Sequence, residues 1–350
     1  MIAVGAPANA AGPASAREPA AGLLQVIDLA VEFRTRRGVV HAVDGISFDV
    51  QAGEVVALVG ESGCGKSATA YSILRLIADP GRISAGQVRF EGTDLLGLSD
   101  EAIRGVRGNR ISMVFQEPMS SLNPVQRIGD QVAEPLTQHR LANRAQAWAR
   151  AAELLRRVNI PDPEARLRDY PHQFSGGMRQ RVMIAIAMAC APRLIIADEP
   201  TTALDVTVQA QIIELLKAAV QADATGLLLI THNLAVVARY ADRVNVMYGG
   251  RIVESASADD LFAHPGHPYT LGLLNSVPTL DQSHGAQLIP ITGQPFDPLQ
   301  RPSGCSFHPR CPQANDRCRA QSPPVFEPRA GHRVVCWLAD SAGGVQRRPA

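Results

Sequence analysis

The stretch 60–67 constrains the fold more than any other part of this sequence. It reads Gly-Glu-Ser-Gly-Cys-Gly-Lys-Ser and lies between an apolar run, 55–59, and a segment of helical character, 68–77. A buried strand, a glycine-rich turn and a helix form the context that a phosphate-binding loop requires. The glycines let successive backbone N–H groups point at phosphate oxygens, and the start of the helix adds its positive dipole end. Lys66 can reach the β- and γ-phosphates, and the Ser67 hydroxyl can bind Mg²⁺.

Composition and charge exclude several classes of protein. The chain has 350 residues, enough for one large domain or two, and a formal net charge of +1. This charge gives no overall attraction to nucleic acid, so we expect no nucleic-acid partner. The longest strongly apolar run, 182–191, is too short to span a bilayer, so a membrane role would depend on partner proteins. Prolines interrupt the first 22 residues, which predicts a disordered tail and no export signal.

The pattern of apolar residues predicts an α/β core. Alternation along 23–33 and 39–50 predicts two half-exposed antiparallel strands. Continuous apolar runs predict buried strands at 55–59, 111–115, 194–197 and 226–231. Prolines after residue 117 and an Ala-, Leu- and Arg-rich stretch at 145–158 predict a mostly helical insert. Beyond about residue 263 prolines become frequent, which predicts a small irregular C-terminal region that needs its own staple.

Polar residues follow the apolar runs where a nucleotide hydrolase needs them. Asp198 and Glu199 follow one run, and a Mg²⁺-organising carboxylate and a group that polarises water belong at such a place. His232 follows the next run and can contact the γ-phosphate or orient Glu199. Gln116 follows a third run and can reach Mg²⁺ and the attacking water. An Asp-Glu-Pro run can also simply cap a strand, but the phosphate-binding loop favours the functional interpretation.

A second candidate anion site opens another helix. Ser175 is in N-cap position and is followed by Gly176 and Gly177. One chain with one phosphate-binding loop should not need a second such site. A head-to-tail dimer accounts for it, with this turn closing on the nucleotide of the other subunit.

These motifs together resemble the ATP-binding-cassette (ABC) ATPases over residues 23–263. In order, they match Walker A (60–67), the Q-loop (Gln116), the signature (174–178), Walker B with its catalytic glutamate (194–199), the D-loop (203–205) and the switch histidine (His232). The resemblance implies a P-loop core with a RecA-like mixed sheet, an antiparallel β-subdomain and an α-helical insert. It also implies that Phe33 stacks on adenine, although His41 is nearby.

The resemblance assigns the site residues. It implies that Glu199, His232 and Gln116 are catalytic. It also implies that Ser67, Gln116 and Asp198 bind Mg²⁺. The implied ATP contacts are Phe33, Gly60, Glu61, Ser62, Gly63, Cys64, Gly65, Lys66, Ser67, Ala68, Gln116, Asp198, Asp205 and, across the dimer, Ser175, Gly176 and Gly177.

Three segments are similar to the dipeptide and oligopeptide importer branch, specifically its D-type subunit. They are 116–124, 178–185 and the His-Pro-Tyr-Thr run at 267–270, followed by a cysteine-rich tail. The resemblance implies an ATPase that energises peptide import from the cytoplasmic face of the inner membrane. It implies a second, different ATPase subunit, two membrane permeases and an extracytoplasmic peptide-binding protein as partners. Nickel and other small-solute importers of the same branch are the alternative, and a soluble or redox-regulatory ABC ATPase is a further one.

The tail carries four cysteines, Cys305, Cys311, Cys318 and Cys336. Four thiolates in a proline-rich segment suit either tetrahedral zinc or an iron–sulfur cluster. The resemblance implies a [4Fe–4S] cluster on these cysteines, with Zn²⁺ as the alternative. The predicted organisation is a tail (1–22), an ABC domain (23–262) with its helical subdomain (117–179), a C-terminal region with the four-cysteine site (263–340) and a final tail (341–350).

Overall fold

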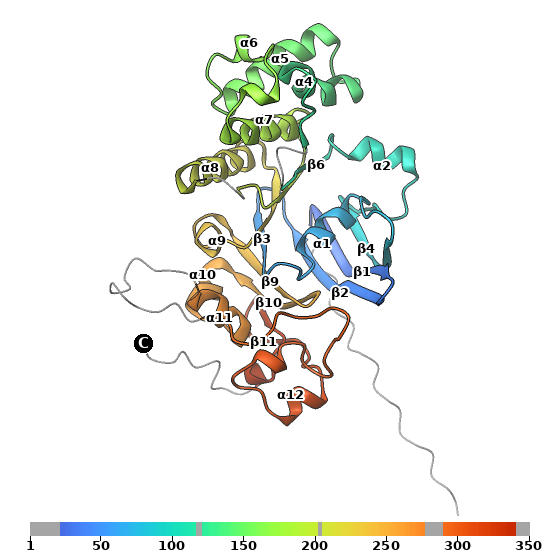
Figure 1. The fold of residues 1–350 in the computed structure, drawn as a ribbon, viewed down its shortest axis with the longest axis vertical. Coiled ribbons are helices and arrows are strands. Elements are labelled where there is room, and N and C mark those ends of the chain that lie inside the picture. Colours follow the sequence, from blue (N-terminus) through green and yellow to red (C-terminus); the bar gives the residue numbers. More distant parts are fainter. Residues whose placement is uncertain (1–21, 117–120, 202–204, 277–289, 341–350) are drawn as a thin grey trace, which may run out of the picture.

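The computed structural model describes residues 22–116, 121–201, 205–276 and 290–340. The molecule is elongated, with helices at one end, a mixed sheet in the middle and a compact C-terminal region at the other end (Figure 1). The predicted tails, 1–22 and 341–350, lie outside the described residues apart from Gly22. Two expected functional segments also lie partly outside them, at 117–120 and 202–204.

The alternating stretches form antiparallel strands, as the sequence predicts. Strands β1 (Leu24–Thr35) and β2 (Gly38–Val50) pair with each other, and β4 (Gly81–Phe90) and β5 (Thr93–Asp94) complete a sheet in the order β2-β1-β4-β5. Strand β4 begins at Gly81, well before its buried residues Val88 and Phe90. Its first residues are mostly exposed, so pairing with β1 rather than apolar burial extends this strand.

The apolar runs form a second sheet that organises the molecule. Its order is β11-β12-β10-β9-β3-β8-β7-β6. The strands are β3 (Val55–Val59), β6 (Ile111–Val114), β7 (Leu194–Asp198), β8 (Gly226–Thr231), β9 (Arg243–Tyr248), β10 (Arg251–Ser257), β11 (Phe326–Arg329) and β12 (His332–Val334). Strands β6, β7, β8, β3 and β9 run parallel, whereas β10, β12 and β11 are antiparallel. The carboxyl ends of the parallel strands therefore meet at one edge, where the predicted site residues follow them.

Helices accompany both sheets. They are α1 (Lys66–Ile73), α2 (Asp100–Val106), α8 (Val206–Asp223), α9 (Leu234–Tyr240) and α10 (Ala258–Ala263). The predicted insert forms what we call the helical layer, residues 128–188. It contains α4 (Ile128–Gln138), α5 (Arg144–Arg157), α6 (Pro163–Arg166), the 3₁₀ turn η1 (Pro171–Gln173) and α7 (Gly176–Met188). Its core is aliphatic and continues into β7, β8 and α8.

The C-terminal region, residues 263–340, is not separate from the main sheet. Its short helices and 3₁₀ turns are α11 (Pro268–Asn275), η2 (His308–Arg310), α12 (Asp316–Ala320) and η3 (Trp337–Asp340). Strand β12 pairs with β10 and so extends the main sheet. Tyr269 and Phe307 are buried against Tyr248 of β9, with ring centroids 4.6 and 5.1 Å from its ring. Sheet pairing and tilted or edge-on ring contacts thus hold a region that has few aliphatic residues.

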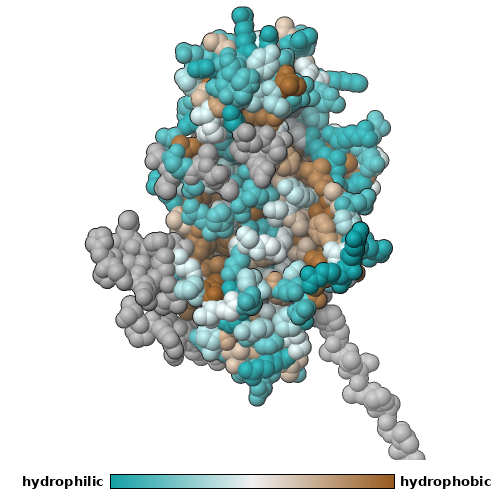
Figure 2. Space-filling view, in the orientation of Figure 1, coloured by the Kyte–Doolittle hydropathy of each residue, from teal (hydrophilic) through white to brown (hydrophobic). Residues whose placement is uncertain are grey.

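Hydrophilic side chains cover much of the face seen in Figure 2, and apolar ones gather in patches over the middle of the molecule. Large apolar side chains that remain exposed include Phe115 and Val125, at 38% and 79%. They flank the segment 117–120 on both sides.

Candidate functional site

The phosphate-binding loop, 60–67, turns between β3 and α1 as predicted. Gly60 and Gly65 have φ values of 152° and 107°, which favour glycine. A Cβ at Gly60 would lie 2.2 Å from the Met247 carbonyl oxygen, and one at Gly65 would lie 2.2 Å from that of Ala42. The backbone at Met247 and at Ala42 therefore lies so close to the loop that a side chain larger than hydrogen does not fit at Gly60 or Gly65.

Lys66 is held over the loop. Its Nζ donates to the carbonyl oxygens of Gly60 at 2.8 Å and Glu61 at 3.0 Å, and the residue is 6% exposed. A buried ammonium needs such acceptors. The positive charge therefore lies at the loop where a phosphate would bind.

Ser67 and Asp198 meet although they are far apart in the sequence. The Ser67 hydroxyl donates to Asp198 Oδ1 at 3.1 Å. Asp198 is completely buried at the end of β7, and its Oδ2 has no hydrogen-bond partner among the described residues. Burial raises the pKa of Asp198 and the Ser67 bond opposes this rise. An unpartnered carboxylate oxygen beside a hydroxyl fits Mg²⁺, which prefers oxygen ligands and would supply the missing positive charge.

Glu199 lies between Gln116 and His232. Its Oε2 accepts from Gln116 Nε2 at 3.1 Å, and its Oε1 lies 3.3 Å from His232 Nδ1. The backbone of Glu199 is in the left-handed region, with φ of 46°, and its N–H donates to the Ile230 carbonyl oxygen at 2.8 Å. Such strained residues cluster at functional sites. The structure brings these three predicted residues together, and their roles stay predictions.

The Ser-Gly-Gly turn begins α7, in the helical layer. Ser175 caps the helix, with its side chain accepting from the Met178 N–H at 3.3 Å. A Cβ at Gly177 would come within 3.0 Å of Val208. Figure 1 shows α7 away from α1, so within one chain the turn is not part of the phosphate-binding loop. Its predicted action on the nucleotide of another subunit remains a prediction.

Two other predicted contacts remain untested. In the D-loop, Ala203 and Leu204 lie outside the described residues, and Asp205 caps α8 by accepting from the Val208 N–H at 2.9 Å. Phe33 is half-buried on β1, and a Cβ at Gly81 would lie 2.5 Å from its ring. Stacking of Phe33 on adenine stays a prediction.

The predicted metal centre of the tail is contradicted. Among the residues that the structure describes, no group of three or more His, Cys, Asp or Glu side chains could hold a metal ion. Cys305, Cys311, Cys318 and Cys336 line a hollow of about 10 Å³, together with apolar and aromatic side chains and with His267, His308 and Gln313. Burial raises the pKa of the Cys311 thiol to about 11 and that of Cys336 to about 12, which disfavours the thiolate that binds metals. The expectation of a [4Fe–4S] cluster, or of Zn²⁺ in its place, was wrong because spacing and resemblance say nothing about this burial.

Comparison with known proteins identifies the family. Residues 43–202 match the family described as "ABC transporter", and residues 253–318 match "Oligopeptide/dipeptide transporter, C-terminal region". The dipeptide transport ATP-binding protein DppD of Bacillus subtilis (strain 168) is 49% identical over 91% of this chain and 95% of its own length. This chain belongs to the ABC transporter ATPases.

A further relative and a solved structure support the same family for this ABC ATPase. The oligopeptide transport ATP-binding protein OppD of Escherichia coli (strain K12) is 47% identical over 92% of this chain and 95% of its own length. The solved dimeric cassette MJ0796 superposes with a TM-score of 0.61 and 26% identity, covering 67% of this chain and 98% of that one. The predicted P-loop ABC ATPase fold with its mixed sheet is confirmed, as is the ATPase class, which binds ATP with Mg²⁺. Within the described residues, no helix has the length and apolar character that crossing a membrane requires.

Two side chains of the C-terminal region reach the phosphate-binding loop of this ABC ATPase. The Tyr269 hydroxyl accepts from the Glu61 N–H at 2.8 Å, and the Arg310 guanidinium donates to both carboxylate oxygens of Glu61 at 2.6 and 2.9 Å. Tyr269 belongs to the His-Pro-Tyr-Thr run that resembles the importer branch, whereas no sequence motif singles out Arg310. No local pattern could have signalled a partner that lies 249 positions away.

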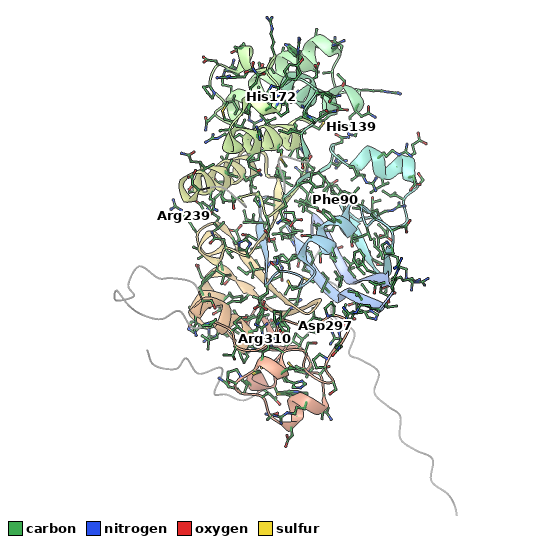
Figure 3. All side chains as sticks on the ribbon, in the orientation of Figure 1. Phe90, His139, His172, Arg239, Asp297 and Arg310 are labelled. Atoms are coloured by element: carbon green, nitrogen blue, oxygen red, sulfur yellow. The ribbon has the colours of Figure 1, made fainter. Side chains whose placement is uncertain are left out.

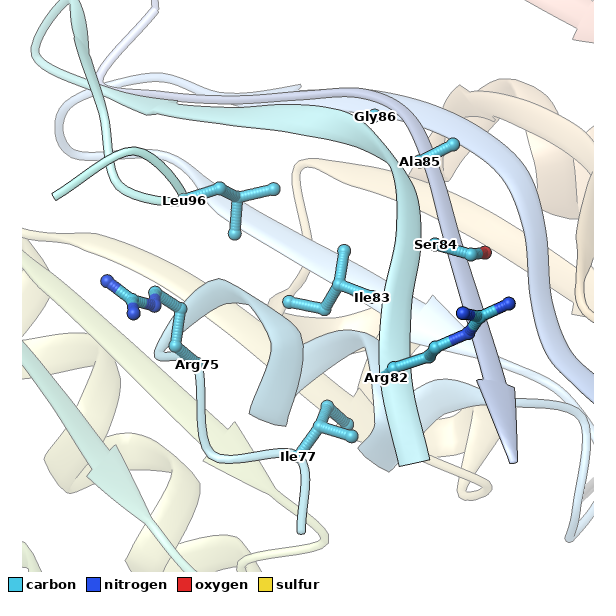
Figure 4. Close-up of a pocket in the computed structure, with 8 residues that line it drawn as sticks. All are labelled: Arg75, Ile77, Arg82, Ile83, Ser84, Ala85, Gly86 and Leu96. Carbon is cyan, nitrogen blue, oxygen red and sulfur yellow. The ribbon is translucent and has the colours of Figure 1, made fainter. Parts of the chain in front are cut away.

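One hollow of the ABC ATPase lies away from the site. It measures about 450 Å³ and lies between the segment after α1 and strand β4 (Figure 4). Since the phosphate-binding loop is at the opposite end of α1, this hollow has no part in phosphate binding. Its two arginines, Arg75 and Arg82, already form ion pairs with Asp100 and Glu32.

Proposed function

We propose that this ABC ATPase energises the import of di- and oligopeptides through a membrane transporter. The position of Glu199 between Gln116 and His232, beside the Ser67–Asp198 pair, carries the proposal for hydrolysis. The match of residues 253–318 to the oligopeptide/dipeptide transporter C-terminal region, and the names of the relatives, support peptides as the cargo.

In the proposed mechanism, the loop N–H groups and Lys66 hold the phosphates of ATP. Ser67, Asp198 and Gln116 would hold Mg²⁺, which supplies positive charge to the phosphate oxygens. Glu199 accepts a hydrogen bond from the attacking water, and His232 orients Glu199. Water attacks the γ-phosphorus, the bond to the β-phosphate oxygen breaks, and ADP and inorganic phosphate leave.

The partners that we propose are a second ATPase subunit and membrane permeases, with a binding protein that delivers the peptide outside. The turn at Ser175–Gly177 would close on the nucleotide of the second subunit. Exposed Phe115 and Val125, on either side of 117–120, support a permease contact there. This arrangement places the ATPase at the cytoplasmic face of the membrane.

The substitution Glu199→Gln tests the hydrolytic role. We expect the variant to bind ATP as the wild type does and to lose most of its turnover, because an amide is a far weaker acceptor for the proton of water. Glu214→Gln on α8 is the matched control and should keep full turnover. Undiminished phosphate release by Glu199→Gln would contradict the role of this residue.

The cargo is tested by uptake in cells that carry the complete transporter. Uptake of a labelled dipeptide should depend on the wild-type chain and fail with Glu199→Gln. Uptake of nickel instead of the dipeptide would support the alternative within the same branch.

A further inference from the structure

The C-terminal region holds Glu61 of the phosphate-binding loop by two separate groups. The Tyr269 hydroxyl accepts a hydrogen bond from the backbone N–H of Glu61, and Arg310 forms a bidentate ion pair with the Glu61 carboxylate. The Glu61 carbonyl oxygen accepts from Lys66 at 3.0 Å. Because its N–H is already used, Glu61 does not donate to phosphate in this arrangement. It acts as the point where the loop is fixed.

Both groups that hold Glu61 are themselves fixed. Tyr269 is completely buried, and its ring lies against Tyr248 and Phe307. The Arg310 side chain is 5% exposed, its Nε donates to the Thr292 carbonyl oxygen at 3.1 Å, and its guanidinium lies 5.9 Å from the centre of the Tyr248 ring. Figure 3 shows Arg310 where the C-terminal region meets the main sheet. A bidentate Arg–carboxylate pair with one partner so buried adds geometric specificity as well as free energy.

A chain of hydrogen bonds sets the position of Tyr269 from the far side. The His267 ring accepts from the Tyr269 N–H at 3.0 Å, and the His267 N–H donates to Glu254 at 2.9 Å. Glu254 of β10 also lies 2.7 Å from Nε2 of His332 on β12. The contacts that define the C-terminal region therefore end at the phosphate-binding loop.

We propose that Tyr269 and Arg310 are positioning residues for nucleotide binding, which fix Glu61 and so hold the loop in the shape that receives the phosphates. The proposal rests on ATP binding at this loop. Fixing the loop before ATP arrives lowers the ordering cost of binding, so this contact sets the affinity for MgATP more than the rate of hydrolysis. The C-terminal region thereby acts on the nucleotide of its own chain.

The test compares the dissociation constant for MgATP, KM and kcat in the complete transporter that contains the full-length chain. Tyr269→Phe removes only the hydroxyl, and we expect KM and the dissociation constant to rise roughly 3- to 10-fold with kcat nearly unchanged, the range for one lost hydrogen bond. Tyr240→Phe is the matched control, because this buried tyrosine donates to Glu214 instead and should bind MgATP normally.

A second pair of variants separates positioning from simple destabilisation. Arg310→Lys keeps the charge but loses the two-pronged contact, and it should raise KM in the same way. Arg243→Lys disturbs a comparable arginine that bridges Asp49 and Glu54, away from the loop. It should lower the melting temperature without changing KM. Glu61→Gln should raise KM by itself and remove most of the further effect of Arg310→Lys.

The outcomes distinguish this inference from the proposed function. Wild-type protein that hydrolyses ATP, with KM unchanged in both Tyr269→Phe and Arg310→Lys, would overturn the positioning role alone. A rise of KM in Arg243→Lys as large as that in Arg310→Lys would also overturn it. A complete wild-type transporter that does not hydrolyse ATP would overturn the proposed function instead.

Discussion

The two ends of the molecule are built in different ways. The helical layer is held by aliphatic packing, with Leu, Ile, Val and Ala side chains buried between its helices and the sheet. The C-terminal region is held by tilted and edge-on aromatic rings and by buried polar groups, such as the His332–Glu254 pair, whose side chains are 2% and 0% exposed. This difference matches the proposed roles of the two ends at the site. The helical layer carries the Ser-Gly-Gly turn at the start of α7. The C-terminal region fixes the phosphate-binding loop through directional hydrogen bonds and an ion pair.

The largest expected effect tests the aliphatic end. Leu155 on α5 is fully buried, so Leu155→Ala should lower the free energy of unfolding by roughly 2–5 kcal/mol through lost transfer energy and a cavity. Leu141 lies in the same layer but is 53% exposed. The substitution Leu141→Ala should therefore change the free energy of unfolding by less than about 0.5 kcal/mol. Denaturant titration measures both. Equal effects would show that aliphatic packing does not hold this layer.

A somewhat smaller effect is the pH dependence of stability that His267 gives to the C-terminal region. Burial lowers the pKa of His267 to about 4, although the nearby Glu254 carboxylate opposes this shift. The unfolded state therefore binds a proton below about pH 6.5 that the folded state takes up only near pH 4. Stability is complete above about pH 6.5, and we expect roughly 3 kcal/mol to be lost as the pH falls to 4.

Melting curves across this range check the prediction. His267→Asn keeps an acceptor for the helix start but does not titrate, so its melting temperature should depend less on pH. The titration of His332 does not contribute to the predicted loss of stability between pH 6.5 and pH 4. Although burial lowers its pKa, the contacts with Glu254 and Asp260 outweigh burial and raise it. The stability from His332 is complete below pH 6.5 and is lost only as the pH rises through the raised value. The same acid sensitivity in wild type and His267→Asn would contradict the assignment.

The smallest effect on stability concerns the turn on α7. Ser175→Ala removes an N-cap and should cost about 1 kcal/mol. It should leave MgATP affinity unchanged and lower turnover in the assembled transporter, in contrast to Tyr269→Phe. Ser99 caps α2 in the same manner, so Ser99→Ala should cost a similar amount and leave turnover intact. Turnover that falls equally in both variants would remove the contrast between the two ends.

The core and its site were largely predictable from local signals. Apolar runs gave the parallel strands, and the polar residues that follow them, such as Asp198 and Glu199, meet at one edge because parallel strands share their carboxyl ends. Alternation predicted β1 and β2 in the same way. These features depend on short stretches of sequence, and the fold brings them together by its topology.

Features made by distant partners could not be predicted. Strand β12 has three residues and pairs with β10, about eighty positions earlier, so neither stretch signals the other. The contact between Arg310 and Glu61 has the same character. The cysteine spacing suggested metal ligands, but the burial that raises the pKa of the Cys311 and Cys336 thiols comes from packing in three dimensions.

The pairing of β12 and β11 on the main sheet also bears on solubility. An open edge of β10 would offer unpaired backbone groups to other chains, which is a route to aggregation. The strand that ends the sheet on this side, β11, has four residues and contains Glu327, Pro328 and Arg329. A short strand with charges and a proline is a poor template for further pairing. The C-terminal region therefore protects the sheet from edge-to-edge association, in addition to any action on the nucleotide.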